Sequence, residues 1–87
     1  MKKFEYTIKD SIGIHARPAG LLVKEAQKFD CNIYIKNTQN SKNGDAKKIF
    51  ALMGLGAKCG TVVEVICDGE DEENAITCLK NFFENNL

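Results

Sequence analysis

The sequence has no tryptophan, one proline, one histidine and no excess of charge, with 12 basic and 12 acidic residues among 87. The charge balance argues against a nucleic-acid-binding protein, which normally carries an excess of Lys and Arg. No apolar run approaches the roughly 20 residues that span a bilayer, and none follows the basic start Met1–Lys2–Lys3, as one would in a signal peptide. We therefore expect a single small cytoplasmic domain, residues 1–87, with a modest core and no membrane or nucleic-acid partner.

The four cysteines are widely spaced and include no C-x-x-C pair. Zinc sites need closely spaced ligands, usually with histidine partners, so the sequence predicts no metal site, and nothing in it indicates a cofactor. An even count permits two disulfides, whereas a cytoplasmic protein would keep its thiols reduced and partly buried. The residues concerned are Cys31, Cys59, Cys67 and Cys78.

The apolar residues alternate at a period of two in some segments and follow helical spacing in others. This pattern predicts strands at 4–8, 32–36 and 61–67, with a weak strand near 38–44, and helices from about 15 to 28, at 48–53 and after Asp71. The order β-α-β-β-α-β-α, in so short a chain, predicts an α+β fold with helices on one face of a mostly antiparallel sheet. The hairpin turn is placed at Asn40–Ser41 or Asn43–Gly44, of which the second pair is the stronger turn signal.

The only histidine and the only proline lie together in Gly13-Ile14-His15-Ala16-Arg17-Pro18. Proline is tolerated in the first turn of a helix, so a helix should begin at or just after His15, with Gly13 allowing the sharp turn before it. His15 would then be the N-cap, beside the unpaired N–H groups of Ala16 and Arg17 and the positive end of the helix dipole. An imidazole in such an anion site, with a guanidinium fork beside it, suggests a histidine that carries a phosphoryl group. The alternative is an ordinary helix entry with a solvated histidine and arginine.

The stretch Gly13-Ile14-His15-Ala16-Arg17-Pro18-Ala19 resembles the active-site signature of HPr, the phosphocarrier family of the bacterial sugar phosphotransferase system. The resemblance extends from Phe4, through 52–56 and 68–72, to Phe83. It implies an open-faced β-sandwich, in which a four-stranded antiparallel sheet is covered on one face by three helices. It also implies that His15 accepts a phosphoryl group on Nδ1, the pros nitrogen, with Arg17 as the phosphate ligand.

In this family the phosphoryl group comes from phospho-enzyme I, ultimately from phosphoenolpyruvate, and passes to sugar-specific IIA domains. The resemblance therefore implies a monomeric phosphotransfer intermediate rather than a catalyst in its own right. The positions that form the family's partner surface are here Gly20, Lys24, Lys28, Lys48, Ile49, Phe50 and Met53. We expect an exposed apolar patch on the short helix, with at least one of its residues partly in the core.

Many family members carry a regulatory serine that caps the short helix, and Lys48 occupies that position here. Lysine has no hydroxyl group to phosphorylate and is a poor N-cap, so we expect no serine-kinase regulation. Two other functions stay open. The protein could be a regulatory binding protein that reports its phosphorylation state without passing the group on, or a carrier for a nitrogen-type or dihydroxyacetone branch.

Overall fold

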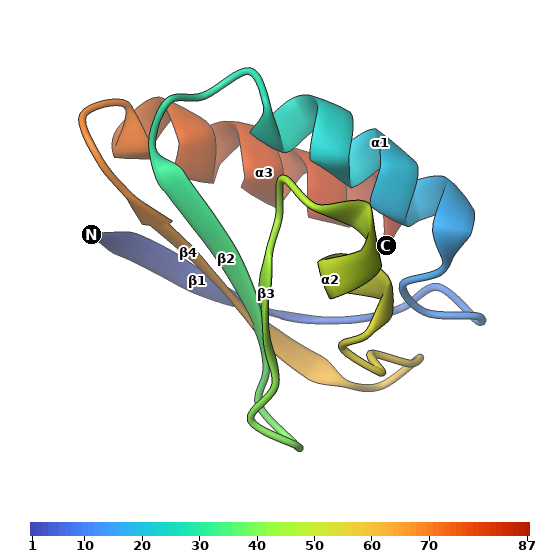
Figure 1. Cartoon of the computed structure of the whole chain (residues 1–87). Coiled ribbons are helices and arrows are strands. Elements are labelled where there is room, and N and C mark those ends of the chain that lie inside the picture. The colour runs from blue at the N-terminus through green and yellow to red at the C-terminus, as the bar shows by residue number, and fades with distance from the viewer.

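The computed structural model describes all 87 residues, Met1–Leu87, and arranges four strands and three helices in the order expected from the sequence (Figure 1). The elements are β1 (Lys2–Thr7), α1 (Ala16–Ala26), β2 (Asn32–Asn37), β3 (Asn43–Asp45), α2 (Ile49–Met53), β4 (Val62–Asp68) and α3 (Glu72–Asn86). None of the helices is long and apolar enough to cross a membrane.

The four strands form one antiparallel sheet in the order β1-β4-β2-β3. The β-branched run of β4 lies between β1 and β2, as expected for the most strand-prone segment. The register can be followed along one row of residues that points toward the helices. From β1 to β3 this row consists of Phe4, Val65, Ile35 and Gly44, each opposite the next. Alternate residues along each strand therefore point toward the helices.

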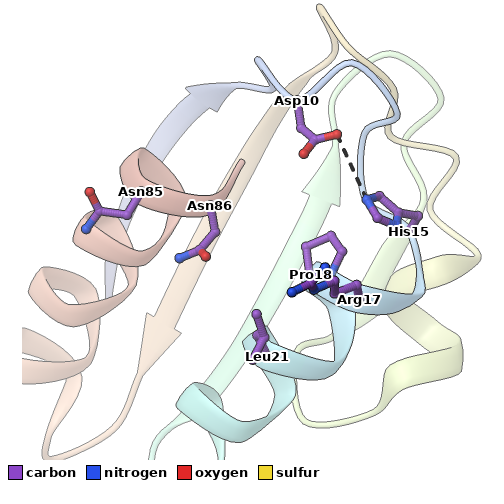
Figure 2. Close-up of a pocket in the computed structure, with 7 residues that line it drawn as sticks. All are labelled: Asp10, His15, Arg17, Pro18, Leu21, Asn85 and Asn86. Atoms are coloured by element: carbon purple, nitrogen blue, oxygen red, sulfur yellow. Dashed lines mark ion pairs between the residues drawn. The ribbon is translucent and has the colours of Figure 1, made fainter.

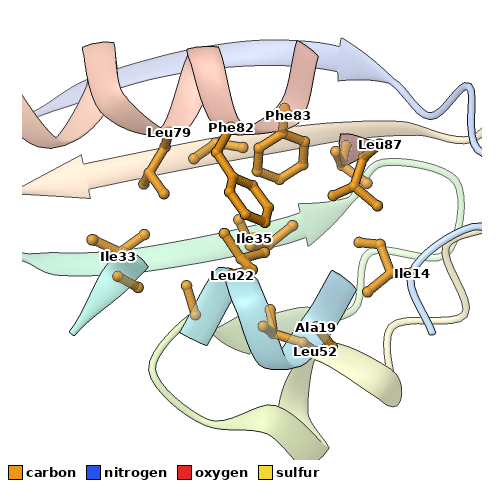
Figure 3. Close-up of a cluster of buried hydrophobic side chains, with 14 of the residues drawn as sticks. Ile14, Ala19, Leu22, Ile33, Ile35, Leu52, Leu79, Phe82, Phe83 and Leu87 are labelled. Atoms are coloured by element: carbon orange, nitrogen blue, oxygen red, sulfur yellow. The ribbon is translucent and has the colours of Figure 1, made fainter. Parts of the chain in front are cut away.

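All three helices cover the same face of the sheet and leave the other face open (Figure 1). This confirms the α+β fold predicted from the sequence pattern and the open-faced β-sandwich that the family resemblance implied. Between the layers lies a cluster of apolar side chains in which Leu22 of α1, Ile35 of β2 and Leu79 of α3 are fully buried (Figure 3). Phe83 is also fully buried and packs edge-on against Phe4, with ring centroids 5.8 Å apart. Residues at helical spacing in α1 and α3 thus build the core that the sequence pattern predicted.

The helix α1 ends at Ala26, two residues before the expected limit at Lys28. The last turn tightens there, because the N–H of Lys28 donates to the carbonyl of Glu25 in a bond of the 3₁₀ type. Phe29, in the loop beyond the helix, also packs against the core. The short helix α2 begins at Ile49, with Lys48 as its N-cap.

The hairpin between β2 and β3 decides between the two turn positions that the sequence left open. Asn43 and Gly44, the stronger turn signal, lie in β3, whereas the connection turns through Asn40 and Ser41. Ser41 takes a left-handed φ of 62°, and Asn40 donates to the carbonyl of Leu55 at 3.1 Å. Gly44 has another role, since a Cβ there would lie 2.8 Å from the backbone oxygen of Ala51 in α2. The glycine lets β3 approach α2 closely and does not form the turn.

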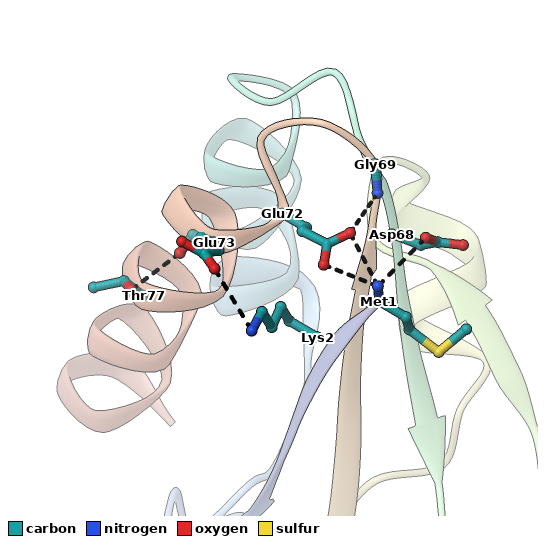
Figure 4. Close-up of polar contacts among 7 residues, drawn as sticks. All are labelled: Met1, Lys2, Asp68, Gly69, Glu72, Glu73 and Thr77. Carbon is teal, nitrogen blue, oxygen red and sulfur yellow. Dashed lines mark hydrogen bonds and ion pairs between the residues drawn. The ribbon is translucent and has the colours of Figure 1, made fainter.

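Polar contacts join the start of β1 to the start of α3 (Figure 4). The carboxylate of Glu72 accepts hydrogen bonds from the amino group of Met1 at 2.8 Å and from the N–H of Gly69 at 3.1 Å. Both hydrogen bonds lower the pKa of Glu72, the one from Met1 having the larger effect. Glu72 and Glu73 place negative charge on the first turn of α3, where the helix dipole favours it.

All four cysteines are free thiols, so neither of the disulfides that their even number permits is present. Cys31 and Cys67 are buried in the core, Cys78 is half-buried and Cys59 is exposed. Burial raises the pKa of Cys31 to about 11 and that of Cys67 to about 12, so both thiols stay protonated at neutral pH.

Gly13 and Gly60 offer a direct test of how the loop before α1 is held. Both have positive φ, at 86° and 90°, but a Cβ on Gly13 would overlap the carbonyl oxygen of Ala57, whereas a Cβ on Gly60 meets nothing within 4 Å. Gly60→Ala should lower the free energy of unfolding by about 1–2 kcal/mol from backbone strain alone. Gly13→Ala should lower it by about 2–5 kcal/mol, because overlap adds to strain. Urea unfolding measures both, and equal losses would contradict the close contact.

Candidate functional site

The loop between β1 and α1 is held by backbone hydrogen bonds to two other parts of the chain. The N–H groups of Lys9 and Asp10 donate to the carbonyl oxygen of Leu87 at 2.6 and 2.8 Å. The N–H of Ile14 donates to the carbonyl of Ala57 at 3.0 Å. The loop therefore leads into α1 along one defined path, although it has no regular structure of its own.

His15 is the N-cap of α1, as the sequence predicted. Its backbone is extended, with φ −119° and ψ −174°, and its carbonyl accepts the first helical hydrogen bond, from Ala19, at 2.9 Å. No side chain caps this helix end. The N–H groups in the first turn of a helix have no helical partner, and because Pro18 has no N–H, the free donors after the N-cap are those of Ala16 and Arg17. These donors and the imidazole lie at the positive end of the helix dipole.

The His15 side chain, 35% exposed, lines a shallow pocket of about 390 Å³ between the start of α1 and the end of α3 (Figure 2). Arg17 lines the same pocket, so the structure brings the two predicted site residues together. Its guanidinium group has the fork geometry that suits phosphate oxygens. Asn85 and Asn86 border the pocket from α3. An accessible imidazole beside a cation and two free N–H groups can act as a nucleophile toward a phosphoryl group.

Asp10 belongs to this pocket and was not among the residues predicted from the sequence. Its Oδ1 lies 4.0 Å from Nε2 of His15, an ion-pair distance (Figure 2). The same oxygen accepts the N–H groups of Ile12 at 2.9 Å and Gly13 at 3.3 Å. An aspartate followed three residues later by glycine is typical of such a turn, so the turn was readable from the sequence. The short distance between Asp10 and the imidazole could not be predicted from the sequence.

An exposed apolar surface lies on the two shorter helices. Phe50 of α2 is 84% exposed and Met53 is 42% exposed, whereas Ile49 is half-buried against the core. This matches the expectation that at least one residue of the short helix contributes to the core. Leu21 of α1 and Ile12 of the loop are also exposed and were not predicted to belong to this surface. Each is an apolar residue outside the core pattern, which is the feature that could have identified them.

The remaining predicted partner-surface positions lie in or next to the same two helices: Gly20 and Lys24 in α1, Lys28 two residues beyond its end, and Lys48 at the N-cap of α2. Gly20 is half-buried, and a Cβ there would lie 3.8 Å from Cδ1 of Ile49, so α1 and α2 touch at this point. Lys24, Lys28 and Lys48 are exposed. Lys28 donates to Glu25 at 3.0 Å, and this hydrogen bond is the main cause that lowers the pKa of Glu25, with one from Cys78 adding to it. Lys24 and Lys48 have no ion-pair partner, whereas Glu25 balances the charge of Lys28.

The residues of the structure form no cluster of three or more His, Cys, Asp or Glu side chains that could hold a metal ion.

Comparisons with known proteins find similar sequences along almost the whole chain. The family model described as the PTS HPr component phosphorylation site matches residues 2–85. The phosphocarrier protein HPr of Mycoplasma capricolum is 44% identical over 80 residues, which cover 92% of this chain and 88% of that protein.

Two solved structures show the same fold. A mycoplasma histidine-containing phosphocarrier protein has a TM-score of 0.91 and 40% identity, with 97% of this chain and 93% of that chain covered. The Bacillus subtilis catabolite repression protein Crh, solved as a domain-swapped dimer, has a TM-score of 0.77 and 32% identity, with 100% and 98% covered. Sequence and structure agree over nearly the whole length, and the chain belongs to the HPr family of phosphocarrier proteins.

Proposed function

We propose that this protein accepts a phosphoryl group on Nδ1 of His15 from phospho-enzyme I and passes it to sugar-specific IIA domains. The observation that carries the proposal is the position of the half-exposed imidazole at the N-cap of α1, in one pocket with Arg17. In this proposal the protein works in the cytoplasm as a monomer. It is a substrate of two other proteins and is not itself a catalyst.

The transfer step uses the neutral form of the ring. The Nδ1 lone pair attacks phosphorus, the bond from phosphorus to the donor atom breaks, and its electron pair stays with the donor. His15 keeps the proton on Nε2, so the phosphorylated ring carries a positive charge. The N–H groups of Ala16 and Arg17 and the Arg17 guanidinium hold the phosphoryl oxygens through charge-assisted hydrogen bonds. Only these few donors hold the phosphoryl group, so the acceptor protein can remove it again.

The docking surface proposed for both partners consists of Leu21, Lys24, Lys28, Lys48, Ile49, Phe50 and Met53, with Gly20 at the contact of α1 and α2. Exposed apolar side chains with a rim of lysines suit a transient complex with an acidic partner surface. Such a complex should bury on the order of 1,200 Å² or less in total, so that the partners separate after each transfer.

Incubation with phosphoenolpyruvate and enzyme I tests the proposal directly. The wild-type protein should gain one acid-labile phosphoryl group, seen as a mass increase at neutral pH that is lost in acid. His15→Ala should gain none, and Arg17→Ala should be phosphorylated about 10- to 100-fold more slowly, because it loses a charged hydrogen-bond donor.

A second stage of the same assay separates the open alternatives. Purified phosphoprotein should transfer the group to a sugar-specific IIA domain. A phosphoprotein that binds its partner and keeps the phosphoryl group would instead be a regulatory binding protein. Transfer only to a nitrogen-type or dihydroxyacetone acceptor would identify another branch of the system.

Phe50→Asp tests the docking surface. The side chain is 84% exposed, so the change should leave the thermal unfolding midpoint close to the wild-type value, while kcat/KM for transfer from phospho-enzyme I falls about fivefold or more. Tyr34→Asp is the matched control, because Tyr34 is an exposed aromatic residue on the open face of the sheet. If both variants accepted and donated the phosphoryl group at the wild-type rate, the surface would lie elsewhere.

Lys48 at the N-cap of α2 predicts the absence of serine-kinase regulation. Incubation of the wild-type protein with ATP and the regulatory kinase of the family should leave no acid-stable phosphate, because lysine offers no hydroxyl group at this position. Lys48→Ser supplies one and should become a substrate. Acid-stable phosphate on a serine of the wild-type protein would contradict the prediction, and mass spectrometry of peptides would locate it.

A further inference from the structure

We propose that Asp10 is a positioning residue for phosphoryl transfer, whose carboxylate keeps the imidazole proton of His15 on Nε2 and leaves the Nδ1 lone pair free to attack phosphorus. The juxtaposition that carries this inference is the 4.0 Å distance between Oδ1 of Asp10 and Nε2 of His15 (Figure 2). The inference deepens the proposed function and rests on it.

The carboxylate of Asp10 is fixed in place by its own loop. Its Oδ1 accepts the N–H groups of Ile12 and Gly13, and the backbone N–H of Asp10 donates to Leu87 at 2.8 Å. The side chain is 30% exposed, so most of its surface is shielded from solvent. The oxygen that faces the imidazole therefore cannot turn away without breaking two hydrogen bonds of the turn.

The charge of this carboxylate distinguishes the two neutral forms of the ring. A neutral imidazole carries a proton on one nitrogen and a lone pair on the other. An aspartate carboxylate is negative at neutral pH, so it attracts an N–H at Nε2 and repels a lone pair there. With the proton on Nε2, the lone pair lies on Nδ1, the nitrogen that must attack phosphorus. The opposite form has a proton on Nδ1 and cannot react there.

The same carboxylate acts after the transfer. When the Nδ1–P bond has formed and the donor bond has broken, the ring holds both the phosphoryl group and the Nε2 proton, and it is positively charged. Asp10 then supplies the opposite charge next to Nε2. Arg17 is the only other charged side chain that lines the pocket, and it is a cation that can serve the phosphoryl oxygens but not the ring proton. Asn85 and Asn86 are neutral.

Asp10→Asn removes the negative charge of the side chain and keeps its hydrogen bonds in the turn. The asparagine Oδ1 can still accept the N–H groups of Ile12 and Gly13, so the fold should be unchanged, while the negative charge beside Nε2 is lost. In ¹⁵N-labelled protein at a pH where His15 is neutral, the ratio of the Nε2–H form to the Nδ1–H form should fall by a factor of roughly 1.5 to 5, because the attraction between a carboxylate and a neutral N–H is no stronger than a partly exposed ion pair. The rate of phosphorylation by phospho-enzyme I should fall with it.

Two further variants serve as controls. Glu70→Gln removes one negative charge from an exposed residue beyond β4, at the opposite end of the sheet from His15, and should leave the ratio and the rate unchanged. Asp10→Ala removes the charge and the turn together. Wild-type values in Asp10→Asn with a loss only in Asp10→Ala would mean that Asp10 serves the turn alone and would overturn the inference. A wild-type protein that enzyme I cannot phosphorylate would refute the proposed function, whereas the tautomer ratio, measured without any partner, reports separately on Asp10.

Discussion

The close contact between Gly13 and the segment around Ala57 is the constraint on which the site depends. Gly13 can take its positive φ and lie against the Ala57 carbonyl only because it has no side chain, and that same carbonyl accepts the N–H of Ile14. This contact sets the direction in which the chain enters α1. The N-cap position of His15, its free neighbouring N–H groups and its distance from Asp10 all follow from that entry.

The site combines a rigid framework with weak binding of the phosphoryl group. The buried layer between sheet and helices holds α1 in place through residues such as Leu22, and the loop is tied to the chain on both sides. The pocket itself is shallow and open, with one guanidinium and two unpaired N–H groups. Such a site can stabilise a phosphoryl group without enclosing it, which suits a protein that has to give the group up again.

Local patterns predicted the parts of the fold that local forces decide. The alternation in β1 and β4, the helical stripe in α1 and the proline in its first turn each depend on residues close together in the chain. The pair Asn43–Gly44 shows where that reasoning fails. As a dipeptide it favours a turn, but packing of Gly44 against Ala51 across the fold outweighs that preference.

The sequence by itself determined the order of the elements, the helix start at His15 and the pairing of His15 with Arg17, because each depends on backbone chemistry over a few residues. Tertiary structure alone decided which apolar residues stay outside the core, so that Phe50 is exposed while its neighbour Ile49 is half-buried. It also decided that Asp10 faces the imidazole. That distance depends on a loop held by contacts from residues more than 40 positions away, such as Ala57, and no local pattern in the chain encodes it.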